Sequence, residues 1–134
     1  MLTPFELGYR YVVPAIKRLL VEMLSSEYSM TQREIAKALG MSQSAVSRYL
    51  SMERGGLIKI SAFKDVDEML HKLAQKIAKN SIDEYQLILE LIKVTLYMFS
   101  KRYICRFHAY VDRDVDIRKC KICPMIFSQV IKLR

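Results

Sequence analysis

Residues Gln32 to Leu50, with the sequence QREIAKALGMSQSAVSRYL, constrain the fold of this chain more than any other stretch. Thr31 and Glu34 just before and inside it have the T-x-x-E spacing of a capping box, in which each residue satisfies a backbone N–H of the other at a helix start. Ile35 and Leu39 follow at the i, i+4 spacing of one helix face. The sequence therefore predicts a short amphipathic helix that begins after Thr31.

A second short helix is predicted after a tight turn. Gly40 lies just past the first helix, where a left-handed backbone is cheap only for glycine, and Ser42 is a natural N-cap for the next helix. Ala36 is small at the point where the two helices have to approach each other. The apolar face of the second helix comprises Val46, Tyr49 and Leu50. This pattern is typical of a helix-turn-helix, which places its second helix in the major groove of DNA.

The outward face of this second helix is polar and comprises Gln43, Ser44, Ser47 and Arg48. A glutamine amide pairs with adenine and an arginine guanidinium with guanine, while serine hydroxyls bind bases or phosphates. Including the start of each helix, the residues predicted to contact DNA are Thr31, Gln32, Ser42, Gln43, Ser44, Ser47 and Arg48. The alternative is an ordinary amphipathic helix pair with a solvated polar face. The joint occurrence of the caps, Ala36, Gly40 and Val46 at their expected offsets favours DNA recognition.

The segment Gln32–Leu50 resembles the helix-turn-helix of repressor-type bacterial and archaeal regulators. The preceding VVPAIKRLL, Val12 to Leu20, is similar to the N-terminal segment of a group of archaeal one-component regulators. The resemblance covers about the first half of the chain and implies a DNA-binding unit. In some members of that group this unit is fused to a thiamine-phosphate-synthase-like domain. Because 134 residues leave no room for such a domain, we expect no thiamine ligand.

The charge balance agrees with a nucleic-acid partner. The chain has 22 Lys and Arg against 14 Asp and Glu, a net charge of +8, which favours polyanions but does not by itself choose between DNA, RNA and anionic lipid. Glu6, Arg10 and Pro14 interrupt the early apolar residues, which argues against a signal peptide. Glu90 and Lys93 interrupt the most apolar region, which argues against a membrane span. We expect a soluble cytoplasmic protein.

Helical signals precede the helix-turn-helix. Thr3, Pro4 and Glu6 predict a helix start with a capping-box partner and proline in the first turn. Pro14 is expected to end or kink this helix, which then restarts toward Ser25. A bent or broken helix therefore leads into the DNA-binding pair.

The region after the helix-turn-helix begins with Gly55 and Gly56. The apolar run Leu57–Ile60 fits a strand or the remnant of a wing. Apolar residues then recur at helical spacing over Asp65–Lys79, with Asn80 as a stop. The sequence therefore predicts a helix over Asp65–Lys79.

A long helix is predicted next, because Ser81 and Glu84 form another S-x-x-E box and the helical pattern runs to about Arg102. One apolar face comprises Tyr85, Ile88, Ile92, Leu96 and Phe99, and the other comprises Leu87, Leu91, Val94 and Met98. Since a small domain rarely buries both faces, we predict that one of them meets a second subunit in a homodimer. The alternative is a fully buried central helix in a monomer. A two-fold dimer presents two recognition helices roughly 34–36 Å apart to a palindromic site.

The last part of the chain contains a possible metal site. Cys105 and His108, then Cys120 and Cys123, follow the pattern C-x2-H-x11-C-x2-C, two ligand pairs separated by a loop. This is the spacing of a tetrahedral structural zinc site, and all three cysteines of the chain fall within it. Ordinary reduced cysteines are the alternative. A disulfide is disfavoured by the odd cysteine count and the cytoplasmic expectation. We expect His71, the other histidine, to be a surface residue.

The sequence does not decide the metal. Three thiolates and one imidazole suit Zn²⁺, the first choice, but the same ligands can hold an iron–sulfur cluster, and Pro124 directly follows Cys123 as in ferredoxin-type runs. A zinc site would be structural, whereas a cluster would make the protein a redox or iron sensor.

Most of the excess positive charge surrounds the proposed metal site. Residues 1–60, 61–100 and 101–134 carry net charges of +3, −1 and +6. The basic residues near the site include Arg102, Arg106, Arg113, Arg118, Lys119 and Lys121. They can bind phosphates beside the operator or offset the charge of bound thiolates. Our hypothesis is that metal loss loosens this tail and weakens DNA binding.

The predicted fold is all-α and has three parts. These are a helix-turn-helix DNA-binding domain at 1–60, a helical dimerisation region at 61–103 and a basic metal-binding tail at 104–134. No glycine-rich phosphate loop or catalytic triad pattern is found, so we expect no enzyme. The expected function is a dimeric sequence-specific transcription regulator with a C-terminal zinc site. The alternatives are an iron–sulfur redox-sensing regulator with the same ligands, a DNA-binding accessory subunit of a recombinase, and a sequence-independent chromatin protein.

Overall fold

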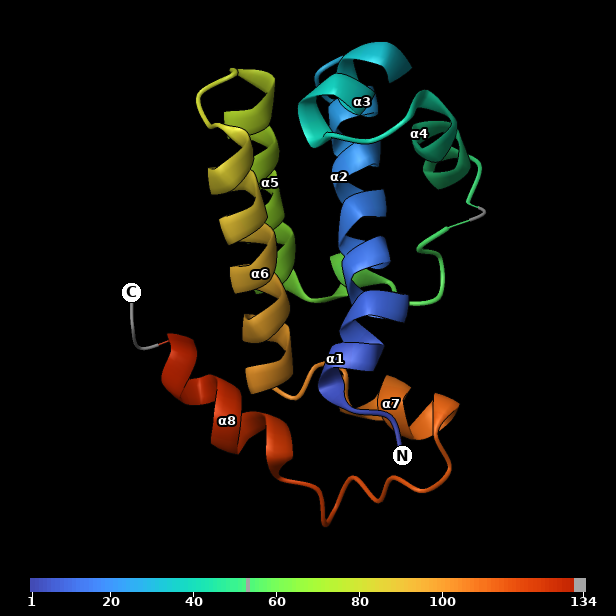
Figure 1. Ribbon diagram of the computed structural model, residues 1–134, viewed down its shortest axis with the longest axis vertical. Coiled ribbons are helices and arrows are strands. Elements are labelled where there is room, and N and C mark those ends of the chain that lie inside the picture. The colour runs from blue at the N-terminus through green and yellow to red at the C-terminus, as the bar shows by residue number, and fades with distance from the viewer. Residues whose placement is uncertain (53, 132–134) are drawn as a thin grey trace.

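The computed structural model describes residues 1–52 and 54–131 (Figure 1). Position 53, in the predicted DNA-binding domain, and positions 132–134, at the end of the predicted tail, lie outside the described residues. All the regular structure in the described part of the chain is helical, which confirms the predicted all-α class. None of its helices is long and apolar enough to cross a membrane.

The first helix is continuous but changes its winding before Pro14. Helix α1 spans Pro4–Leu7, a π-helical segment spans Gly8–Val12, and α2 spans Val13–Ser26. The predicted cap is confirmed, because the Glu6 N–H donates to the Thr3 hydroxyl at 3.3 Å and the Thr3 N–H donates to the Glu6 carboxylate at 3.1 Å. Pro14 lacks the N–H that an α-helix needs, and the wider π-helical winding just before it accommodates this loss.

Helix α2 forms the centre of the fold. It contacts α3 (Gln32–Leu39), α4 (Gln43–Leu50) and α5 (Lys64–Ala78). The buried side chains that fill these contacts include Ile16, Leu20, Leu24, Ile35, Val46, Val66 and Leu70. Figure 1 shows α2 between the α3–α4 pair and the α5–α6 hairpin. The helix-turn-helix therefore shares one hydrophobic core with the helices that follow it.

Helix α6 spans Glu84–Ser100, and its predicted start was wrong by two residues. Its N-cap is Asp83, whose carboxylate accepts from the Gln86 N–H at 2.8 Å, while the Gln86 amide oxygen accepts from the Asp83 N–H at 2.9 Å. Ser81 instead donates its hydroxyl to the Lys76 carbonyl at 3.1 Å and so closes the end of α5. The sequence contains two overlapping capping patterns, one that begins at Ser81 and one that begins at Asp83. The pattern at Asp83 starts α6, because the Ser81 hydroxyl is bonded to the end of α5.

The predicted strand at Leu57–Ile60 is not formed. The described chain passes through a loop into a 3₁₀ turn at Ile60–Ala62. Ile58 and Ile60 are buried, whereas Leu57 is 74% exposed. The apolar residues therefore anchor the connection between α4 and α5 to the core instead of pairing in a sheet.

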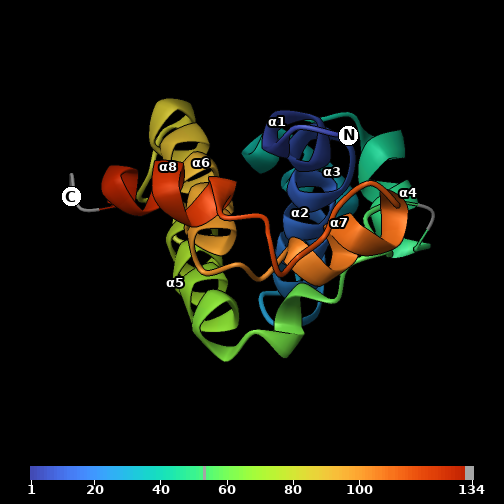
Figure 2. The ribbon, with the colours of Figure 1, turned by 90° about the horizontal axis from the view of Figure 1, so that it is seen from below.

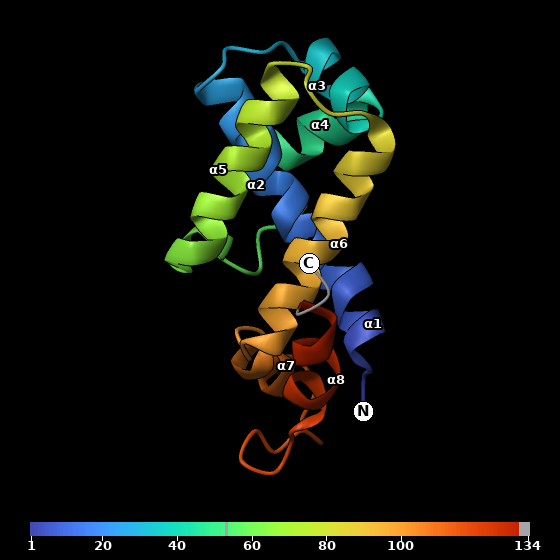
Figure 3. The same cartoon turned by 90° about the vertical axis from the view of Figure 1, so that its left-hand side faces the viewer.

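The C-terminal helices lie at the opposite end of the molecule from α3 and α4 (Figure 1). Helices α7 (Cys105–Val111) and α8 (Ile122–Ile131) lie beside the start of α1, and α8 packs against the end of α6 (Figures 2 and 3). The Phe127 ring contacts Phe99 of α6 at 5.7 Å and Phe5 of α1 at 6.4 Å between centroids. The predicted tail is therefore part of the folded unit.

Candidate nucleic-acid interface and cysteine–histidine cluster

The turn between α3 and α4 has the geometry that the sequence predicted. The Glu34 N–H donates to the Thr31 hydroxyl at 3.2 Å, and the Thr31 N–H donates to the Glu34 carboxylate at 3.0 Å. These hydrogen bonds lower the pKa of the exposed Glu34 carboxyl, because they favour its charged form. Gly40 ends α3 in the left-handed region with φ 64°, and the Met41 N–H reaches back to the Ala36 carbonyl at 2.9 Å. The relative orientation of α3 and α4 is thus fixed by local hydrogen bonds.

Helix α4 has one buried apolar face and one exposed polar face. Its N-cap is Ser42, whose hydroxyl accepts from the Ala45 N–H at 3.1 Å. Val46 is fully buried and Tyr49 is 6% exposed, so this face is held against α2 and α3. The predicted outward residues Gln43, Ser44 and Ser47 are exposed, and Arg48 is half-buried. The side chains suited to base and phosphate contacts are therefore presented on one free face.

The surroundings of this face are basic. Thr31 and Gln32 are exposed at the start of α3. Further exposed cations near the two helices are Arg33, Lys37, Arg54 and Lys59. Between Thr31 and Ile60 the sequence has five basic and two acidic residues, and one of the acids, Glu34, is held in the cap. This charge favours a polyanion at the face of α4.

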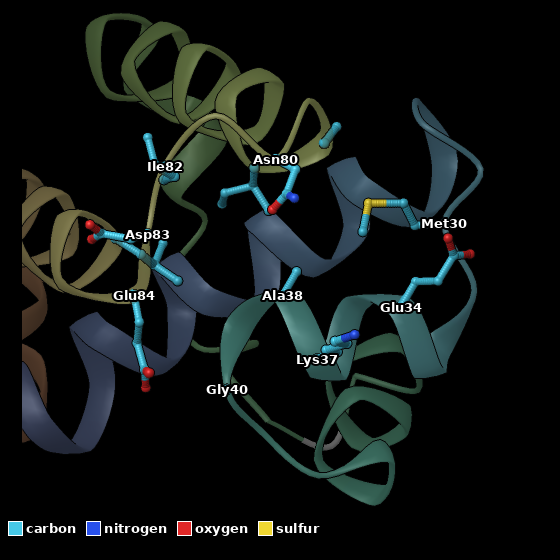
Figure 4. A pocket seen from close by; sticks show the side chains of 12 residues that line it. Met30, Glu34, Lys37, Ala38, Gly40, Asn80, Ile82, Asp83 and Glu84 are labelled. Carbon is cyan, nitrogen blue, oxygen red and sulfur yellow. The ribbon is translucent and has the colours of Figure 1, made fainter.

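An open hollow of about 550 Å³ lies between α3 and the connection of α5 to α6 (Figure 4). Figure 4 shows Lys37, Ala38 and Gly40 on the α3 side and Asn80 and Asp83 on the other. The helix-turn-helix is therefore supported mainly by α2, which contacts both of its helices.

A second hollow follows the end of α4. It is lined by aromatic and basic side chains that include Tyr9, Tyr11, Tyr49, Arg10, Lys17 and Arg54. The backbone at Gly55, with φ 70°, passes close to α2 here. A Cβ at this position would lie 2.4 Å from the Pro14 carbonyl oxygen. The chain after α4 is thus pressed against α2 at a point that requires glycine.

All four predicted metal ligands line one cavity of about 220 Å³. Cys105 and His108 lie one turn apart on α7, Cys123 lies in the first turn of α8, and Cys120 precedes it. The remaining lining is mostly apolar and comes from the N-terminus, the α7–α8 loop and the start of α8: Met1, Leu2, Thr3, Pro4, Val115, Ile117, Ile122 and Pro124. The two sequence pairs therefore line the same cavity.

The donors in this cavity are differently buried. Cys123 is 8% exposed, and its burial, with the nearby Cys105 and Cys120, raises the pKa of its thiol to about 11. His108 is 9% exposed, and among the described residues its Nε2 has no hydrogen-bond partner. Within the described part of the chain, no three His, Cys, Asp or Glu side chains converge closely enough to hold one metal ion. The four donors share a cavity without yet surrounding a single point.

Asp112 stands beside this cluster and was not singled out from the sequence. Its Oδ2 lies 3.5 Å from Nε2 of His108, within ion-pair range but beyond hydrogen-bond length. The same carboxylate accepts a hydrogen bond from the Leu2 N–H at 2.6 Å, which is the main cause of the lowered pKa of Asp112. It thus links the N-terminus to the cluster, across a separation in sequence that no local pattern reveals.

The other histidine is a surface residue, as predicted. His71 is exposed on α5, with Nε2 3.0 Å from the Glu27 carboxylate and Nδ1 2.9 Å from the Asp67 carbonyl oxygen. The hydrogen bond to Asp67 and the pairing with Glu27 raise the pKa of His71. Its role is to connect α5 with the end of α2.

The placement of α7 and α8 argues against the hypothesis that the basic tail binds phosphates beside the same operator half-site as α4. Helices α7 and α8 lie at the opposite end of the molecule's long axis from α3 and α4 (Figures 1 and 3). The exposed face of α4 and the cysteine–histidine cluster are thus two separate sites of one protomer.

Residues 15–59 match a family model described as "Winged helix-turn-helix DNA-binding". The match includes α3, α4 and most of α2, and it covers about a third of the chain. This segment is therefore a winged helix-turn-helix DNA-binding domain, although residues 54–59 form a loop and no hairpin. No curated protein and no solved structure matches the chain.

Proposed function

We propose that this chain, with its DNA-binding domain at residues 15–59, is a sequence-specific transcription regulator that binds DNA as a homodimer. The observation that carries the proposal is the free polar face of α4. Gln43, Ser44 and Ser47 are exposed on it, while Val46 on the opposite side is fully buried. A rigidly held helix with exposed amide and hydroxyl groups is the arrangement that reads base edges in the major groove.

The roles of the surrounding residues follow from this docking. With α4 in the major groove, Gln43 and Ser44 in its first turn reach base edges, as the first residues of recognition helices do. Arg48, one turn later, has the geometry for a guanine or a phosphate. Thr31 and Gln32 at the start of α3 are placed for the DNA backbone, which helix N-termini favour. The exposed cations of this region add affinity that does not depend on sequence.

The exposed surface of α6 supports the homodimer. Leu87, Val94 and Met98 are buried in the core of one chain. On the other face, Tyr85 is 85% exposed, and Ile88, Leu89 and Ile92 are each about half exposed. Ile88 and Ile92 also line an apolar groove of about 490 Å³ with Phe5 and Tyr9. A second copy that packs against this face buries these side chains and supplies the two-fold symmetry that a palindromic operator requires.

Selection of bound sites from random DNA tests the proposal. Recovery of one palindromic sequence supports the dimeric regulator. Recovery of unrelated sequences, with steep salt dependence, contradicts it and indicates the sequence-independent chromatin protein. Recovery of one copy of an asymmetric site, with a stable enzyme partner, indicates the accessory subunit of a recombinase.

The dimer is tested separately by sedimentation of the purified chain. Ile88→Asp combined with Ile92→Asp places two charges on the exposed face of α6 and is expected to convert dimers to monomers. The matched control is Tyr110→Ser, which changes an exposed aromatic residue on α7. A wild-type chain that sediments as a monomer at all concentrations, or a double variant that remains dimeric, contradicts the proposed interface.

A further inference from the structure

We infer that Cys105, His108, Cys120 and Cys123 bind a metal centre through thiolate and imidazole ligands, either one zinc ion or an iron–sulfur cluster. The site is separate from the DNA-binding face and does not depend on the proposed function. All three cysteines of the chain and one of its two histidines line the same cavity. Cys105 and His108 lie one turn apart on α7, Cys120 precedes α8, and Cys123 lies in the first turn of α8.

His108 provides an independent reason to place a ligand here. The imidazole is nine-tenths buried, and its Nε2 has no hydrogen-bond partner among the described residues. A buried polar atom without a partner costs free energy and calls for an explanation. The Asp112 carboxylate lies beside the ring at 3.5 Å, as carboxylates do in carboxylate–histidine–metal arrangements. Because Asp112 faces Nε2, Nδ1 is the nitrogen that would bind the metal, and a small shift of the ring toward Asp112 would satisfy Nε2–H and orient the imidazole.

The surroundings offset the negative charge of thiolate ligands. Cys123 lies in the first turn of α8, where the helix dipole is positive. The Arg102 guanidinium donates to the carbonyl of Ile117, a residue of the α7–α8 loop that lines the cavity. Exposed cations flank both ligand pairs: Arg106, Arg118, Lys119 and Lys121. These four cations are thus placed where an anionic centre benefits from them.

The cavity can be compared with the space and donor geometry that each metal centre requires. It has a volume of about 220 Å³, and the donors do not converge on one point. Zinc needs four donors at about 2.0–2.3 Å, so the donors must move toward one another to close a zinc site. A cluster needs more room and the mostly apolar lining that this cavity has, and Pro124 directly follows Cys123 as in C-P cluster motifs. The shared chemistry is the thiolate-rich donor set.

Metal binding joins parts of the chain that are distant in sequence. The cavity is lined by the first four residues, by α7 and by the start of α8. Because the metal binds the folded arrangement of these segments, occupancy stabilises this end of the molecule. The expected readout is a raised unfolding temperature of the loaded protein.

The test uses the full chain, purified without oxygen and freed of metal with a chelator. One portion is titrated with Zn²⁺ against a coloured chelator, and another is reconstituted with ferrous iron and sulfide. We expect one of the two centres to be retained after desalting, at about one per chain, with a raised unfolding temperature. Visible absorption identifies a cluster, whereas zinc is colourless.

Variants separate this site from adventitious binding. Cys120→Ala is chosen because Cys120 is only partly buried, and it is expected to weaken retention of the metal by at least about 100-fold. His71→Ala removes the other histidine and is expected to bind as the wild type does. Circular dichroism of the metal-free variants checks that they fold. Failure to retain either centre, or equal retention by Cys120→Ala, overturns the inference.

Discussion

The hydroxyl of Tyr103 donates a hydrogen bond of 2.7 Å to the carboxylate of Asp65. Tyr97 of α6 donates to the same carboxylate oxygen, and the Tyr103 ring stacks on Phe63 at 4.5 Å between centroids. The start of α5 is thereby tied to the end of α6 and to the turn before α7. This network connects the helices that follow the DNA-binding domain.

Removal of the Tyr103 hydroxyl is expected to destabilise the protein. Tyr103→Phe retains the ring stack but deletes a hydrogen bond to a charged acceptor, which contributes about 1.5–3 kcal/mol. Because the site is partly open to solvent, we expect a loss near the lower end of that range in the free energy of unfolding. Urea denaturation measures it. The control is Tyr110→Phe, whose ring lies on an exposed part of α7. An unchanged stability of Tyr103→Phe would falsify the role of the network.

The same network predicts a pH dependence. Burial alone would raise the pKa of Asp65, but hydrogen bonds from Tyr97, Tyr103 and the Val66 N–H outweigh burial and lower it. A carboxyl with a lowered folded-state pKa stabilises the fold above its unfolded pKa, about 3.9, and this stabilisation is lost as the pH falls through the folded pKa. The stability difference between wild type and Asp65→Asn is therefore expected to be largest near neutral pH and to shrink below pH 4. A difference that stays constant down to pH 2 contradicts this assignment.

Substitution by alanine is expected to destabilise the protein by different amounts at two glycines that have similar backbone angles. Gly40 has φ 64°, and a Cβ there would make only an ordinary contact of 3.5 Å with the Glu84 carboxylate, so Gly40→Ala costs the left-handed conformation, about 1–2 kcal/mol. Gly55 has φ 70°, and a Cβ there would lie 2.4 Å from the Pro14 carbonyl oxygen, so the backbone itself must move. Gly55→Ala is expected to cost clearly more than Gly40→Ala in thermal or urea unfolding. Equal costs would show that the chain after α4 does not press on α2.

The parts of the fold with local sequence signals could be predicted. The caps at Thr3, Thr31 and Ser42 and the turn at Gly40 depend on residues at most four positions apart, and the structure has them all. Where two local signals competed, as at Ser81 and Asp83, the sequence did not say which one begins the helix.

Long-range features could not be predicted. Nothing near Asp112 in sequence indicates that its carboxylate binds the Leu2 N–H, 110 residues away. The two apolar faces of α6 were visible, but only tertiary packing decides that Leu87 and Val94 are buried and Ile88 and Ile92 exposed. The approach of Cys105 to Cys123 was indicated by their spacing, whereas the apolar lining from the N-terminus was not.

The affinity of the purified protein for its selected DNA site, compared with a scrambled duplex at the same salt concentration, tests the central claim most directly. We predict at least about 10³-fold tighter binding to the selected site. Gln43→Ala is expected to weaken binding to that site by about 1–3 kcal/mol, roughly 5- to 150-fold, and to leave the scrambled duplex unaffected. Equal affinity of the wild type for both duplexes would contradict the assignment of α4 as a sequence-reading helix.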